Sequence, residues 1–150
     1  MPGTYSQILL HVVFSTKARA AFIKPELQSR LHDYIGGIVR AEKGILYAIG
    51  GMPDHVHLLL RWRTDGTIAD LMRTVKSRSS LWVHQTFPRF GAFGWQEGYS
   101  AFSVSKSAEA DVKAYIEKQA DHHQKRDFQQ ELFALLRAHG VSFDPGYVLD

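Results

Sequence analysis

The chain is organised around residues 50–62, which read GGMPDHVHLLLRW. The two glycines and the proline predict a turn, and the apolar run at residues 56–60 is typical of a short, buried strand. Because side chains alternate across a strand, His55 and His57 leave the same face, opposite the apolar core. Two adjacent imidazoles can hold one metal ion or one phosphate. An H-x-H pair also arises by chance in a chain with eight histidines, so the pair needs a partner elsewhere.

Length and composition exclude several classes of protein. A chain of 150 residues is most simply one domain, here residues 1–150, with enough length to bury a core. The absence of cysteine excludes disulfides, a thiolate zinc site and a cysteine nucleophile. We see no apolar run long enough for a membrane span and no signal peptide, so we expect a cytoplasmic protein. The net charge of +3 mildly favours a polyanionic partner.

The hydrophobic periodicity predicts the order β-α-β-β-α-β followed by two helices. The expected segments are strands at 6–15, 45–49, 55–62 and 95–104, and helices at 25–43, 68–82, 107–123 and 127–140. The first six elements match the ferredoxin-like, split β-α-β arrangement of the α+β class. We therefore expect an antiparallel sheet of four to five strands with helices on one face, followed by C-terminal helices.

The helix predicted at residues 107–123 supplies a partner for the histidines. Tyr115 and Gln119 are four residues apart and so lie on one helix face, one turn from each other. Two neutral imidazoles and an amide oxygen would hold a divalent cation and leave positions open for substrate oxygens. A phenol beside such a site would attack a phosphodiester and form a covalent phosphotyrosine.

These segments together resemble a known family. The stretch at residues 52–60 looks like the HUH motif (histidine, hydrophobic residue, histidine) of single-tyrosine transposases of the insertion-sequence 200/605 type, which include REP-associated relatives. Further similar segments, in the same order along residues 5–140, are HVVFSTK at 11–17, LMR at 71–73, KSRSS at 76–80, WQEGY at 95–99 and YIEKQ at 115–119. The HUH motif followed some sixty residues later by tyrosine-x-x-x-glutamine is far more specific than either half.

The resemblance implies a complete active site. Tyr115 matches the nucleophile, which forms a 5′-phosphotyrosine and releases a 3′-hydroxyl, on what would be a C-terminal catalytic helix. His55, His57 and Gln119 match the ligands of a Mg²⁺ or Mn²⁺ ion. The family's substrate is single-stranded DNA with subterminal hairpins. Its members form homodimers whose active sites can be composite, with the tyrosine helix of one subunit serving the histidines of the other.

Basic and aromatic residues are candidates for contact with DNA. Phosphates attract exposed cations, although most such side chains are simply solvated. The candidates are Lys17, Arg19, Arg61, Arg63, Arg73, Lys76, Arg78 and His122. We expect His11 to support the site rather than to bind the ion, and Trp95 to pack in the core.

Two other functions remain open at this point. A ferredoxin-like module that regulates by binding nucleic acid would keep these residues without turnover. A metal-dependent phosphodiesterase acting on small nucleotides would not need Tyr115.

Overall fold

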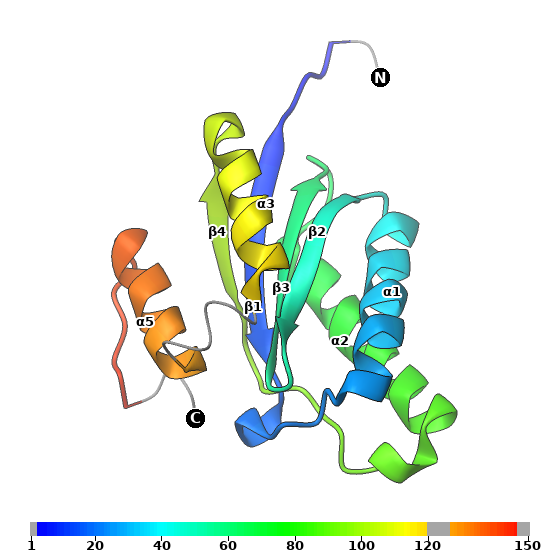
Figure 1. Ribbon diagram of the computed structural model, residues 1–150. Coiled ribbons are helices and arrows are strands. Elements are labelled where there is room, and N and C mark those ends of the chain that lie inside the picture. The colour runs from blue at the N-terminus through cyan, green and yellow to red at the C-terminus, as the bar shows by residue number, and fades with distance from the viewer. Residues whose placement is uncertain (1–2, 120–126, 147–150) are drawn as a thin grey trace.

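The computed structural model describes residues 3–119 and 127–146, which form a four-stranded antiparallel sheet with helices packed against it (Figure 1). The strands are β1 (Ile8–Ser15), β2 (Ile45–Met52), β3 (His55–Trp62) and β4 (Ser100–Val104). The α-helices are α1 (Pro25–Ala41), α2 (Ile68–Thr86), α3 (Glu109–Glu117) and α5 (Phe128–Ala138). Short 3₁₀ helices are η1 (Lys17–Arg19), η2 (Pro88–Phe90) and η3 (Lys106–Ala108).

The strand order is β2-β3-β1-β4, and every neighbouring pair is antiparallel. Strands β1 and β2 are parallel to each other with β3 between them, which is the split β-α-β arrangement predicted from the sequence. The prediction of an α+β, ferredoxin-like fold is confirmed. None of the described helices is long and apolar enough to cross a membrane.

The two faces of the sheet bury different kinds of residue. Val56, Leu58 and Leu60 of β3 point into the main core, which α1 and α2 cover. The opposite face carries His55 and His57 and is covered by α3 and α5. The expectation that the helices lie on one face therefore holds for α1 and α2, and the C-terminal helices cover the face that bears the histidines (Figure 1).

Gly50 and Gly51 do not form the predicted turn. Both lie inside β2, where they pair with His57 and Val56, and the turn to β3 falls at Pro53 and Asp54. The physical reason is close packing, because a Cβ on Gly50 would lie 2.1 Å from the carbonyl oxygen of Ile116 in α3. The glycine allows α3 to approach the strand that adjoins the histidines.

Strand β4 is shorter than the predicted strand at 95–104. It begins at Ser100 because Gly98 adopts a left-handed φ of +81°, which breaks the extended chain. Upstream of that break, Trp95 keeps one isolated bridge to Thr16 at the end of β1. Trp95 packs against the main core and its indole N–H donates to Ser79 Oγ at 2.9 Å, as expected for a core residue.

Candidate active site

The histidine pair of β3 is fully buried and oriented by its neighbours. His55 and His57 are both 0% exposed and lie on the face of the sheet that α3 and α5 cover. His55 Nδ1 lies 2.7 Å from Asp54 Oδ1, and His57 Nδ1 lies 2.8 Å from His11 Nε2. These contacts at Nδ1 orient both rings so that each presents Nε2 to the same space. His11 therefore supports the site, as expected.

Helix α3 delivers the tyrosine and glutamine to the same space. The ring of Tyr115 lies edge-on to His57, with centroids 5.8 Å apart. Gln119, which follows α3 and is 2% exposed, places its Oε1 atom 3.1 Å from His55 Nε2. The structure thus brings together all four residues that the sequence assigned to the site: His55, His57, Tyr115 and Gln119.

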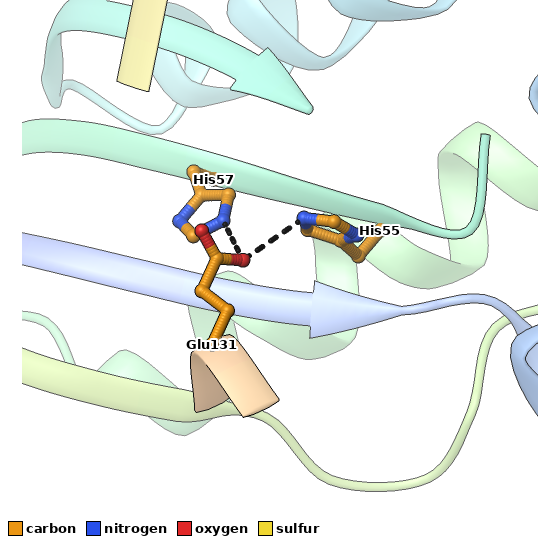
Figure 2. A group of neighbouring side chains, drawn as sticks. All are labelled: His55, His57 and Glu131. Carbon is orange, nitrogen blue, oxygen red and sulfur yellow. Dashed lines mark hydrogen bonds and ion pairs between the residues drawn. The ribbon is translucent and has the colours of Figure 1, made fainter. Parts of the chain in front are cut away.

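A fifth residue, Glu131 of α5, completes the cluster (Figure 2). Its Oε1 atom lies 3.0 Å from His57 Nε2 and 3.2 Å from His55 Nε2. Its other oxygen, Oε2, accepts a hydrogen bond from the Tyr115 hydroxyl. Sequence reasoning missed Glu131, although it lies at helical spacing within the apolar stripe Phe128, Leu132 and Leu135, where a solvated carboxylate would not be expected.

The charges of these groups depend on one another. Burial alone would lower the pKa of His55, but hydrogen bonds and charge interactions with Asp54 and Glu131 raise it to about 9. Burial also favours the neutral form of Glu131, yet hydrogen bonds from His55, His57 and Tyr115 hold the pKa of its carboxyl far below the usual range. Burial and the neighbouring His57 lower the pKa of His11 to about 3, so His11 stays neutral. At neutral pH the cluster therefore pairs a His55 cation with a Glu131 anion.

The donor set fits a divalent cation. One ligand atom from each of His55, His57 and Glu131 lies within 4.8 Å of the other two, and all three residues are buried. Imidazole nitrogens with carboxylate and amide oxygens are ligands that Mn²⁺ and related ions accept in proteins. A cation bound there would replace the proton on His55 as the positive partner of Glu131.

Four of the candidate DNA-binding residues are exposed near one end of the sheet. They are Lys17 and Arg19 of η1 and Arg73 and Arg78 of α2, of which Arg73 also donates to Asp70 Oδ1 in its own helix. Residues 94–98 contact both elements, because the backbone N–H of Lys17 in η1 donates to Gly94 O and the ammonium group of Lys76 in α2 donates to Gln96 O. The same segment pairs with the end of β1, which lies beside His55.

The other described candidates bind to the protein itself. Arg61 donates to Ser6 O, and Arg63 donates to Glu42 O and to Asp65. The ammonium group of Lys76 donates to the carbonyl oxygens of Gln96 and Gly98. His122 lies outside the described residues.

Known proteins resemble this chain over most of its length. A family model described as IS200-like transposase matches residues 4–119, which include every active-site residue named above except Glu131. The chain is 29% identical over 125 residues to the ISDra2 transposase TnpA of Deinococcus radiodurans, covering 79% of this chain and 89% of that protein.

Two solved structures are also similar. The crystal structure of a transposase from D. radiodurans matches with a TM-score of 0.65 and 28% identity, covering 79% of this chain and 95% of the other. A REP-associated tyrosine transposase bound to a REP hairpin shares the fold, with a TM-score of 0.54 and 14% identity over 77% of this chain and 68% of the other. The family match covers well over half of the sequence, and the chain therefore belongs to the IS200-like transposases.

Proposed function

We propose that this transposase cleaves and rejoins single-stranded DNA at hairpin-bearing ends through a covalent bond to Tyr115. The observation that carries the proposal is the contact of the Tyr115 hydroxyl with the Glu131 carboxylate, beside the two histidines and Gln119. A tyrosine hydroxyl held in this way is an oriented nucleophile next to a site for a phosphate-binding cation.

In the first step the Tyr115 oxygen attacks the phosphorus of a phosphodiester. A bond forms between the phenol oxygen and phosphorus, and the bond from phosphorus to the 3′-oxygen of the preceding nucleotide breaks. Glu131 orients the hydroxyl, the phenol proton passes to solvent, and the 3′-oxygen leaves and takes a proton from water to become a hydroxyl group. The reverse reaction with the 3′-hydroxyl of another strand restores a phosphodiester, so rejoining needs no ATP.

His55, His57, Gln119 and Glu131 are the residues that would hold Mg²⁺ or Mn²⁺. The bound ion would polarise the phosphodiester and offset the negative charge that builds up in the transition state. Asp54 and His11 hold the two imidazole rings in the orientation that ligation requires, which is the usual role of partners behind metal-bound histidines.

The substrate would reach the site along the basic end of the sheet. Exposed Lys17, Arg19, Arg73 and Arg78 are the phosphate contacts we propose, together with His122. We expect weaker contributions from Arg61, Arg63 and Lys76, because their side chains are partly buried and donate to backbone carbonyl oxygens. Hairpin DNA as the partner, a homodimer and a cytoplasmic location are further parts of the proposal, supported by family membership. Within the described chain Tyr115 and the histidines meet in one subunit, and a composite site would bring the same residues together between two subunits.

The experiment is denaturing gel electrophoresis after incubation with labelled single-stranded hairpin DNA from the flanks of the gene. Wild-type protein should form a slowly migrating adduct with Mg²⁺ or Mn²⁺ and none with EDTA, and Tyr115→Phe should form none with either metal. Tyr47→Phe is a matched control that removes a tyrosine from β2 and should leave the adduct intact. Binding without any adduct would favour a regulatory nucleic-acid-binding module, and an adduct that survives Tyr115→Phe would place the chemistry on another residue.

A further inference from the structure

A cavity of about 660 Å³ adjoins the nucleophile. Its lining residues come from β1, α3, α5 and the end of β4, on the face of the sheet that bears the histidines. Tyr115, Glu131 and His11 form part of its wall, whereas His55 and His57 do not line it. The cavity therefore adjoins Tyr115 and Glu131 but is not lined by the two histidines of the candidate metal site.

The lining of this cavity suits an uncharged, flat group. Small and apolar side chains such as Val104, Val112 and Ala134 make up much of the described wall. The charged residues among the described lining are the acids Asp111 and Glu131, and the described lining includes no lysine or arginine. A DNA phosphate is anionic and is repelled by such a wall, whereas a nucleobase carries no charge.

We propose that the cavity receives the unpaired base of the nucleotide that stays joined to Tyr115, an inference that rests on the proposed function. In an in-line displacement the leaving oxygen lies opposite the nucleophile, so the nucleotide that departs is directed away from Tyr115. The retained nucleotide is attached through its 5′-phosphate to the tyrosine and stays beside it. Its base extends from the sugar beyond that phosphate and is within reach of a cavity that has Tyr115 in its wall.

The cavity also offers contacts that a base can use. The ring of His139, another part of the lining, is held in place by stacking on Phe102 and by a hydrogen bond from its Nδ1 to Leu135 O. An aromatic ring and apolar walls bind any base by stacking and burial, without reading its sequence. Ser103 and Ser105 add hydroxyl groups that can donate to or accept from a base edge.

The test has two parts: a substitution fills the cavity with a large side chain, and abasic oligonucleotides remove the base proposed to occupy it. Ala134→Phe places a large side chain in the lining, and Ala114→Phe is a matched control on an exposed position of α3 outside the lining. Both are made in a Tyr115→Phe background, and affinity is measured by fluorescence anisotropy. The probes are hairpin oligonucleotides from the gene's flanks, with one abasic site moved stepwise along the single-stranded tail.

We expect one position, the first nucleotide 3′ of the cut, at which an abasic site weakens binding at least tenfold. Ala134→Phe should weaken binding of the intact oligonucleotide by a similar factor and should not further weaken binding of the oligonucleotide with that abasic site. Ala114→Phe should change neither affinity. The inference would be overturned if no position of the abasic site weakened binding in this way. It would also be overturned if Ala134→Phe lowered the affinity for intact and abasic DNA by the same factor. Failure of the proposed function shows separately, as the absence of a covalent adduct with wild-type protein, and does not affect this binding measurement.

Discussion

Glu131 lies one turn from Phe128 and from Leu135 on the apolar stripe of α5, and this position accounts for its 1% exposure. A carboxylate buried so deeply needs opposite charges or hydrogen-bond donors, because removal from water otherwise costs several kcal/mol. The two histidines and the tyrosine provide these partners. One side chain thus connects the nucleophile, the candidate metal ligands and the last described helix.

Glu131→Gln should weaken the binding of Mn²⁺ about tenfold, or ~1.4 kcal/mol, because the ion loses an anionic ligand of nearly unchanged shape. Isothermal titration calorimetry measures this directly. Glu117→Gln removes an exposed carboxylate at the end of α3 and is the control, which should bind as the wild type does. Equal affinities in the two variants would show that Glu131 is not a ligand.

His32 in α1 should make the protein less stable in mild acid. Its Nε2 atom is buried without a hydrogen-bond partner among the described residues, and burial lowers the pKa of His32 to about 4 from its ordinary 6.5. The unfolded chain takes up this proton first, so the contribution to stability is complete above pH 6.5 and is lost as the pH falls towards 4. The loss amounts to at most about 3 kcal/mol.

Urea unfolding of the wild type and of His32→Leu between pH 7 and pH 4 isolates this contribution. The difference in unfolding free energy between the two proteins should change with pH in the direction given. If the unfolding free energies of the two proteins changed in parallel with pH, the buried neutral imidazole of His32 would not be the cause of the loss of stability in acid.

The sequence predicted four of the five central side chains, because His55, His57, Tyr115 and Gln119 occur in two motifs with fixed spacing. Glu131 belongs to neither motif and lies on a helix outside the family match. Glutamate on a helix is usually solvated. Only the packing of α5 against the sheet shows that this one faces the histidines.

At the scale of secondary structure, the contact between α3 and β2 positions the nucleophile. Gly50 of β2 lies under the backbone of Ile116, the residue next to Tyr115. Ile116 is fully buried together with Ala48 and Leu59 of the sheet, which anchors the helix at this point. The height of α3 above the sheet therefore decides where the tyrosine hydroxyl lies.

Gly50→Ala should displace α3 and reduce adduct formation more than tenfold. The added methyl group would meet the Ile116 carbonyl, and overpacking of this kind lowers the free energy of unfolding by about 2 kcal/mol. Gel assays of the adduct and urea unfolding measure the two effects. Gly37→Ala is the control, since its methyl group would have open space in α1 and should raise stability by up to about 1 kcal/mol. Wild-type activity in Gly50→Ala would contradict this role of the glycine.

The order and type of the elements were predictable from periodicity, since the helix and strand patterns differ clearly at residues 25–41 and 55–62. The role of Gly50 and Gly51 was not predictable from the sequence. A glycine pair before a proline is typical of a turn, and the close approach of α3, some sixty residues later in the sequence, is a tertiary contact that local patterns do not encode.

On the scale of the whole molecule, one face of the sheet forms the main core and the other face carries the candidate active site. The face covered by α1 and α2 is apolar, whereas the opposite face carries the histidines, the cavity and the C-terminal helices. The exposed cations near residues 94–98 lie at the end of the sheet where His55 begins β3. This arrangement predicts a path for DNA that ends at the active site.

Arg78→Ala should weaken DNA binding uniformly across sequences and lower the slope of log affinity against log salt by about 1, because one phosphate contact is lost. A salt titration with hairpin DNA measures the slope. Lys43→Asn removes a cation at the opposite end of the sheet, at a residue with φ of +68° that suits asparagine, and should leave the slope unchanged. If the slope changed equally in both variants, the overall charge of the protein, and not a DNA path over Arg78, would account for the salt dependence.

The proposed mechanism requires the Tyr115 oxygen to become bonded to the 5′-phosphate at the break. Tandem mass spectrometry of the covalent adduct, after digestion with trypsin and nuclease, tests it most directly. We predict a nucleotide attached through its 5′-phosphate to Tyr115, with a free 3′-hydroxyl on the released strand. A nucleotide attached to any other residue, or joined through a 3′-phosphate, would contradict this mechanism.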